Sequence, residues 1–250
     1  MQLVVLIALL FSAAASALAD APDVDEAIRL RIEERLRKAN LTEQAQVAVS
    51  VEGGRAVLSG TTAQLYTARE AERLAGKEAA SVESRIRVEP EPRSDAQIAQ
   101  EVRDAVLGYI HYTVFDGVEA RVQDGLVWLG GSVRQTYRRD DIEARVAKIA
   151  GVRDIHNDIR VQSLSSHDED LRQQLYRAIY GGALAGRGSV LNAPVHILVD
   201  GGRVTLTGVV ASQVERALIL TLARQTMAFD VDNHLQVEGE EGPAGSGFQG

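Results

Sequence analysis

Apolar residues along this chain follow the same succession of spacings three times. Each cycle opens with apolar residues three or four positions apart, then alternates apolar and polar residues on both sides of a short turn. It returns to the first spacing and closes with a second alternating run. Spacings of three and four place side chains on one face of a helix, whereas alternation places them on one face of a strand. The pattern therefore predicts three copies of an α-β-β-α-β unit.

A glycine-rich hairpin marks the centre of each copy. The matching segments are residues 51–60, 122–131 and 199–208. Their turn pairs are Gly53-Gly54, Asp124-Gly125 and Gly201-Gly202. A two-residue type I′ turn requires positive φ at both central positions, which Gly adopts freely and Asp tolerates. These pairs are structural turn residues and predict the register of each hairpin.

Helices and a closing strand flank each hairpin. The first helices carry Ile28, Ile32 and Leu36; Ile98, Val102 and Val106; and Leu171, Leu175 and Ile179. The second helices carry Ala68, Ala71 and Leu74; Ile142, Val146 and Ile149; and Val214, Leu218 and Leu222. The closing strands carry Val82, Ile86 and Val88; Ile155, Ile159 and Val161; and Val231, Leu235 and Val237. We expect an α+β fold of three tandem α-β-β-α-β domains, each a three-stranded mixed sheet covered on one face by two helices.

The boundaries of the copies follow from breaks in the pattern. We expect domains at residues 22–90, 94–162 and 167–238, with linkers at 90–92 and 163–166. The third copy has extra residues around 181–192. The Gly-rich part of this insertion, residues 181–189, resembles a phosphate loop but has Arg187 where that motif requires Lys, so we interpret it as an inserted loop.

The sequence predicts an export signal at the N-terminal end of the chain and a polar tail at the C-terminal end. The first nineteen residues carry no charge, residues 3–11 are all apolar, and Ala17-Leu18-Ala19 fits a signal peptidase site. We expect residues 1–19 to be a signal peptide cleaved near Ala19, and the protein to be periplasmic or otherwise exported. No later apolar run reaches the roughly 18 residues of a membrane span, so we expect no transmembrane segment in the mature chain. Residues 239–250 read as a disordered polar tail.

Composition excludes several kinds of chemistry. The chain has no cysteine, which removes disulfides, thiolate metal sites and cysteine nucleophiles. Its net charge is −8 and no copy is basic, so a nucleic-acid partner is not expected. The five histidines form no H-x-x-x-H pair, and no G-x-S-x-G motif occurs. We therefore predict no enzyme activity, no metal and no cofactor.

The second copy resembles a known family. It opens with Ser94-Asp95-Ala96, its hairpin at 122–133 has the form G-x-V-x-L-x-G, and its closing segment at 149–161 has the form G-V-x-x-I-x-N. These features resemble the BON domain, named for bacterial osmotically inducible periplasmic and nodulation-related proteins, and in particular the osmotically inducible periplasmic protein Y group. In our alignment the third copy has Ala228-Phe229 where the second has Gly151-Val152, and the first has Ser84 where the second has Asn157.

The resemblance implies an envelope protein without catalysis. It implies binding to phospholipid membrane surfaces or other envelope components and a role in osmotic or envelope stress. Because fold does not fix function, two alternatives remain open: a periplasmic chaperone-like or structural protein that acts through contacts with envelope proteins, and a protein that binds an ion.

An aromatic cluster after the first helix of the second copy is the first candidate binding site. Tyr109, Ile110, Tyr112 and Phe115 stand together in a chain that has only 4% aromatic residues. Tyr is suited to a membrane interface because its ring is apolar and its hydroxyl is polar. The alternative is that Ile110, Val114 and Phe115 close the core over the hairpin.

Three arginines form the second candidate. Arg134, Arg138 and Arg139 could supply the cations that attract anionic lipid, about 1 kcal/mol for each residue. Asp140 and Asp141 follow directly, so a solvated helix start of mixed charge is the alternative. Trp128, in the returning strand of the hairpin, is expected to pack against the sheet or to contact a partner.

Overall fold

The structure is a computed structural model that describes residues 24–41, 45–191 and 193–239. The predicted signal peptide and the tail from residue 240 onward lie outside the described residues. Of the helices described, none has both the length and the apolar character needed to span a membrane. The chain divides into two compact units, Met1–Glu89 and Pro90–Gly250, and each is described by itself.

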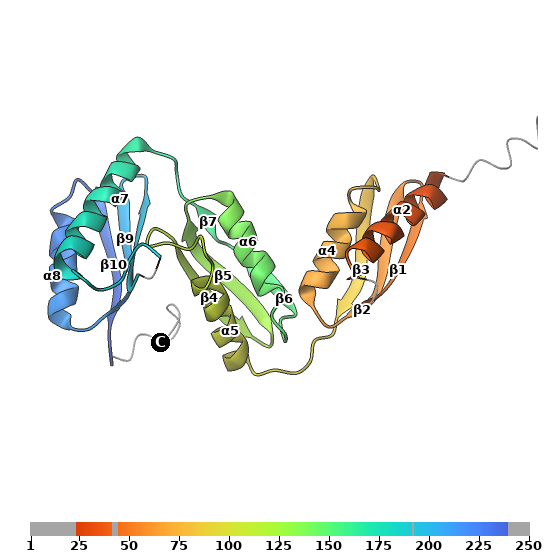
Figure 1. Ribbon diagram of the computed structural model, residues 1–250, viewed down its shortest axis with the longest axis horizontal. Helices are drawn as coiled ribbons and strands as arrows, with labels where there is room; N and C mark the ends of the chain where they lie inside the picture. Colours follow the sequence, from red (N-terminus) through yellow and green to blue (C-terminus); the bar gives the residue numbers. More distant parts are fainter. Residues whose placement is uncertain (1–23, 42–44, 192, 240–250) are drawn as a thin grey trace, which may run out of the picture. The chain divides into compact units, whose positions relative to one another are not determined.

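The first repeat makes up the first unit. Its elements are α2 (Val24–Lys38), β1 (Ala45–Glu52), β2 (Arg55–Thr62), α4 (Leu65–Ala75) and β3 (Ser81–Val88). The sheet has the order β1-β2-β3, antiparallel in the hairpin and parallel between β2 and β3. Helices α2 and α4 cover one face (Figure 1), and Ile32, Leu36 and Leu58 are buried between the two layers.

The second repeat opens the second unit and repeats this order. Its elements are α5 (Asp95–Leu107), β4 (Gly117–Gln123), β5 (Leu126–Val133), α6 (Thr136–Val146), β6 (Asp154–Asn157) and β7 (Arg160–Val161). Strands β6 and β7 both run parallel to β5, so one closing strand is interrupted in the middle. At the interruption Asn157 Oδ1 accepts a hydrogen bond from the Ile159 N–H at 3.1 Å.

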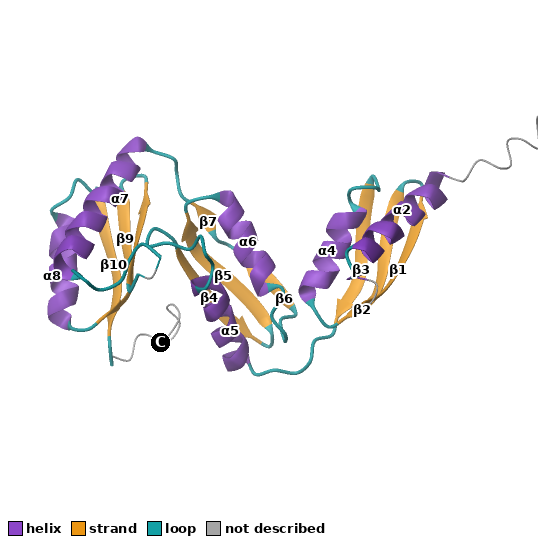
Figure 2. Cartoon of the chain, in the orientation of Figure 1, coloured by secondary structure: helices purple, strands orange, loops and turns teal. Residues whose placement is uncertain are grey.

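The third repeat completes the second unit. Its elements are α7 (Ser166–Ala178), the π-helical turn η1 (Ile179–Ala183), β8 (Val195–Asp200), β9 (Arg203–Val210), α8 (Gln213–Arg224) and β10 (Asp230–Val237). Its sheet has the order β10-β9-β8 (Figure 2). The predicted α+β architecture of three tandem units is thus confirmed, and the insertion after α7 contains η1.

One glycine in each hairpin is fixed by contact with the neighbouring strand. Gly60, Gly131 and Gly208 have φ of 141°, 94° and 120°. A Cβ added to them would lie about 2 Å from the carbonyl oxygen of residue 46, 117 or 194 on the paired strand. No larger residue fits that distance, which explains why glycine occupies this position in each returning strand. All six turn residues at the hairpin tips also have positive φ.

A buried or half-buried aspartate clamps each hairpin tip to the first helix. Both carboxylate oxygens of Asp25, Asp95 and Asp168 accept hydrogen bonds from the two N–H groups of the turn pair, at 2.6–3.0 Å. Each of these residues lies three positions before the first buried apolar residue of its helix. These contacts of the three aspartates were not predicted from the sequence.

Backbone hydrogen bonds also correct one alignment between repeats. The N–H groups of Ala80, Arg153 and Phe229 all donate to the second residue of the turn pair, at 2.9 Å. These three residues are therefore equivalent. The Gly151-Val152 pair consequently corresponds to Met227-Ala228 in the third repeat, and the alignment with Ala228-Phe229 was one residue out of register.

Candidate functional site

The segment between α5 and β4 joins the second repeat to the third. The Val114 N–H donates to the Val190 carbonyl at 2.8 Å, and the Ile197 N–H donates to the Val114 carbonyl at 2.7 Å. Val114 is fully buried and Phe115 is 6% exposed, and both belong to the hydrophobic core of the third repeat. The two repeats therefore share one core although their sheets are separate.

A buried carboxylate holds this segment in place. Asp116 is fully buried and accepts hydrogen bonds from the Thr113 N–H at 2.9 Å, the Thr113 hydroxyl at 2.7 Å and the Arg134 N–H at 2.9 Å. The Arg138 guanidinium lies 2.5 Å from the same carboxylate. An ionised carboxylate in a dry site needs such partners, so the fold of residues 113–116 is tightly specified.

A second polar group lies across the joint. The Arg172 side chain is 3% exposed and donates to the Val199 carbonyl at 2.6 Å and to Gln162 Oε1 at 3.0 Å. Gln162 in turn donates to the Phe115 carbonyl at 2.9 Å. Burial, together with the nearby Arg134 charge, lowers the pKa of Arg172. These bonds couple the closing strand of the second repeat to α7 and β8 of the third.

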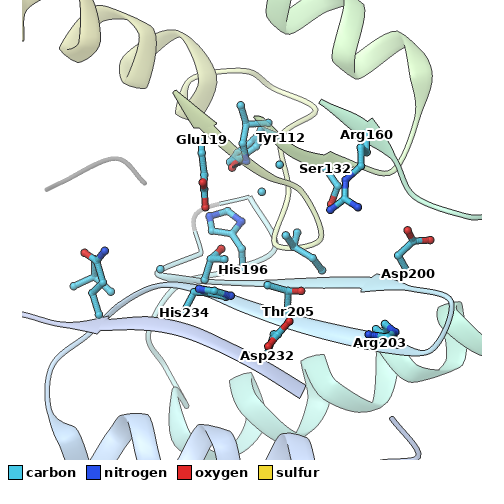
Figure 3. A pocket seen from close by; sticks show the side chains of 18 of the residues that line it. Tyr112, Glu119, Ser132, Arg160, His196, Asp200, Arg203, Thr205, Asp232 and His234 are labelled. Carbon is cyan, nitrogen blue, oxygen red and sulfur yellow. Dashed lines mark hydrogen bonds between the residues drawn. The ribbon is translucent and has the colours of Figure 1, made fainter. Parts of the chain in front are cut away.

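Beside the joint lies a groove with a volume of about 550 Å³. The second repeat contributes Tyr112, Glu119, Ser132 and Arg160, among others, and the third repeat contributes the open face of its sheet. Figure 3 shows Glu119 and Tyr112 on one side of the groove and His196, Thr205 and His234 on the other. This volume is in the range of small-molecule sites, and both charged and apolar side chains line it.

Two histidines lie in one row across the floor of the groove. His196 and His234 both pair with Thr207 in the strand register, so their side chains share one sheet face. His196 Nδ1 lies 3.2 Å from the Thr113 carbonyl oxygen, which can only accept, so this nitrogen carries the proton. Burial lowers the pKa of His196, although hydrogen bonding to Thr113 and the Asp116 charge oppose that effect. His196 is therefore neutral at pH 7.

The predicted aromatic cluster is mostly enclosed by protein. Tyr109, Tyr112 and Phe115 are each 6% exposed, whereas Ile110 is 75% exposed. The Tyr109 hydroxyl donates to Asp141 at 2.5 Å, and the Tyr112 hydroxyl accepts from the Val118 N–H at 3.1 Å. Burial raises the pKa of both tyrosines. Of the four residues, only Ile110 presents an apolar side chain to solvent.

The three predicted arginines all have acidic partners. Arg134 pairs with Glu169 of α7 at 2.7 Å, Arg138 pairs with Asp116, and Arg139 pairs with Asp140 at 2.9 Å. Arg134 and Arg138 thus hold the joint, and their charges are compensated. This arrangement matches the mixed-charge alternative more closely than a free cationic patch.

His111, the residue after Ile110, contacts two tyrosine rings, one of which comes from α6. The His111 ring lies edge-on to both Tyr109 and Tyr137, with centroid distances of 5.4 and 5.9 Å. Tyr137, from the first turn of α6, is 46% exposed. We call Ile110, His111 and Tyr137 the Ile110 surface.

Within the parts of the chain that the structure describes, no group of three or more His, Cys, Asp or Glu side chains is placed to hold a metal ion. His156 pairs with Asp158 at 3.1 Å in an exposed position, and His167 stacks on Phe229 with ring centroids 5.9 Å apart. These two histidines are surface residues with local partners.

Comparison with known proteins identifies the repeats. The BON domain profile matches residues 24–90, 94–163 and 167–239. No curated protein matches the chain. Two similar solved structures are of CdsD, a structural protein of the type III secretion system of Chlamydia trachomatis. One is 13% identical with a TM-score of 0.24, covering 84% of this chain and 92% of that chain. The other, its C-terminal domain, is 14% identical with a TM-score of 0.23, covering 83% and 94%.

The three matches coincide with the three α-β-β-α-β units and together cover most of the chain. The BON domain is a non-catalytic binding domain associated with phospholipid or envelope binding. The chain therefore belongs to the BON domain family.

Proposed function

We propose that this protein is exported to the bacterial envelope, where it binds phospholipid surfaces without catalysing a reaction. Three BON domain matches in tandem carry the proposal. The uncharged N-terminal segment that ends in Ala17-Leu18-Ala19 supports export. A stress-related role, suggested by the family resemblance, belongs to the same proposal.

The Ile110 surface is the proposed point of contact with lipid. Ile110 is an exposed aliphatic side chain directly before His111, whose ring contacts the exposed Tyr137, and the Arg145 guanidinium lies over the Tyr109 ring at 5.6 Å. This combination of apolar, aromatic and cationic groups is typical of residues at a membrane interface. Tyr109 is buried and packs against His111, so it supports the Ile110 surface and does not enter the lipid.

The expected affinity is modest. Burying an Ile side chain contributes about 1.5–3 kcal/mol, and one cation near anionic lipid contributes about 1 kcal/mol. The net charge of −8 opposes approach to an anionic membrane. Binding should therefore be weak and reversible.

Vesicle co-sedimentation tests the proposal. The purified protein should sediment with vesicles of phosphatidylethanolamine and phosphatidylglycerol, and Ile110→Ser should weaken binding by about tenfold, or about 1.4 kcal/mol. Val214→Ser is the matched control, because Val214 is 78% exposed on α8 and lies outside the Ile110 surface. Equal loss in both variants, or no sedimentation of the wild type, would contradict the proposal.

A further inference from the structure

The open face of the second sheet presents an unusual residue to solvent. Trp128, the chain's single tryptophan, is 37% exposed, whereas its neighbours Val127 and Leu129 point inward and are 1% exposed. Arg121 and His156 flank it on the adjacent strands, and the Arg121 guanidinium carbon lies 6.0 Å from the ring centroid. The indole therefore forms a partly exposed apolar platform, with the Arg121 guanidinium over one face of the ring.

The platform leads directly into the groove. Gly130 lies two residues further along β5, on the same face as Trp128, and a Cβ at Gly130 would meet no atom within 4 Å. Its cross-strand partner is Glu119, which lines the groove together with Ser132. The four residue steps of strand from residue 128 to residue 132 span about 13 Å. The platform, the bare strand at Gly130 and the groove thus form one continuous track.

The charges along this track balance. Arg121, Arg160 and Arg203 are interspersed with Glu119, Asp200 and Asp232. A site for an anionic ligand would carry an excess of cations, as phosphate recognition requires. Alternating donors and acceptors with no net positive charge instead complement the hydroxyl groups of an uncharged polar ligand.

The shape of the track separates the remaining ligand classes. An extended peptide adds to a sheet by pairing with an edge strand, but this track runs over the face of a sheet whose central strand is already paired on both sides. A lipid bilayer is broad and cannot enter a groove between two repeats. A linear sugar chain is narrow, presents hydroxyl groups along its edges and offers an apolar ring face to an indole.

We propose that the track from Trp128 into the groove binds a linear polysaccharide strand. Trp128 stacks on one sugar ring, Gly130 leaves room for the chain, and the groove side chains hydrogen-bond to the following sugars. Helices α5 and α6 cover the opposite face of this sheet (Figure 1), which leaves the face that carries Trp128 open. Trp128 and Gly130 are not among the residues of the Ile110 surface, so the two proposals can be tested separately.

Co-sedimentation with protein-free peptidoglycan sacculi, competed by a soluble β-1,4-linked N-acetylglucosamine tetramer, tests this inference. The wild-type protein should bind sacculi and be released by the tetramer. Gly130→Gln should weaken binding by about tenfold, or about 1.4 kcal/mol, because it fills the track. No atom lies within 4 Å of the added Cβ, so this variant should fold normally.

Three further variants sharpen the test. Trp128→Ala should weaken binding and Trp128→Phe should restore most of it. Gly181→Gln is the matched control, because a Cβ there also meets no atom within 4 Å and Gly181 lies outside the track. Vesicle binding should be the same for Gly130→Gln and the wild type. No binding to sacculi, or equal binding by Gly130→Gln and the wild type, would overturn the proposal.

Discussion

Replacing Asp168 by alanine should strongly destabilise the third repeat. The Asp168 side chain is 1% exposed and accepts hydrogen bonds from Gly201 N–H at 3.0 Å, Gly202 N–H at 2.7 Å and the Ser163 hydroxyl at 2.9 Å. Burial alone would raise the pKa of this carboxyl, but these hydrogen bonds and the Arg172 charge together lower it. The ionised form is therefore the one that stabilises the fold.

The expected loss of stability in Asp168→Ala follows from the three hydrogen bonds that the carboxylate accepts. A hydrogen bond to a charged group contributes about 1.5–3 kcal/mol, and the three donors would remain with no carboxylate to accept from them. Since the desolvation cost of the carboxylate is also removed, we expect Asp168→Ala to lower the free energy of unfolding by about 3–5 kcal/mol. Asp95 is half-buried and, among the residues that the structure describes, accepts side-chain hydrogen bonds from the two turn N–H groups alone, so Asp95→Ala should cost about 1–2 kcal/mol.

Urea denaturation followed by far-ultraviolet circular dichroism measures both variants. Because the folded-state pKa of Asp168 is lowered, its contribution is complete above the ordinary carboxyl pKa of 3.8 and is lost as the pH falls through the lower folded value. The difference between wild type and Asp168→Ala should therefore be constant near neutral pH and shrink in acid. A cost for Asp168→Ala no larger than that for Asp95→Ala would refute the role assigned to the buried clamp.

Two further predictions concern the hairpin glycines and the groove histidine. Gly131→Ala should lower the free energy of unfolding by at least about 2 kcal/mol, because its Cβ would overlap the Gly117 carbonyl and the residue has positive φ. Gly130→Ala should change the free energy of unfolding by less than about 0.5 kcal/mol. Thermal denaturation compares the two variants, and equal midpoints would contradict the explanation. His196 has a lowered folded-state pKa, so its contribution is complete above about pH 6.5 and declines by up to about 1.4 kcal/mol per pH unit below it. His196→Asn, which can still donate to the Thr113 carbonyl, should remove that part of the decline, and an unchanged profile between pH 7 and 5 would show that another group is responsible.

The repeat structure could be predicted because each element leaves a local signal in the sequence. Turn pairs such as Gly53-Gly54 require positive φ, and the alternation on either side of them fixes which side chains face the helices. The same signals recur three times, so each copy supports the interpretation of the others. The aspartate clamp also has a local signal, an Asp three residues before the first buried helix residue, but only the structure shows what that carboxylate contacts.

The joint between the second and third repeats could not be predicted. The sequence shows that Phe115 is apolar, but it does not show that Phe115 packs in the core of the following repeat. The alternative in which Ile110, Val114 and Phe115 close the core over the hairpin identified the burial of Val114 and Phe115 but assigned it to their own hairpin. It was wrong for Ile110, which is 75% exposed. The groove likewise depends on how two domains meet, which depends on contacts such as that between Arg134 and Glu169.

The sharpest test of this joint is residue-resolved hydrogen exchange on wild type and Phe115→Ala. Deleting a buried aromatic ring costs about 3–5 kcal/mol, and here the ring fills the core of the third repeat. We predict that the variant loses protection in β8 and β9, at residues such as Ile197 and Leu206, as well as in its own repeat. Loss confined to residues 94–163 would show that the two repeats are independent domains and would contradict the shared core.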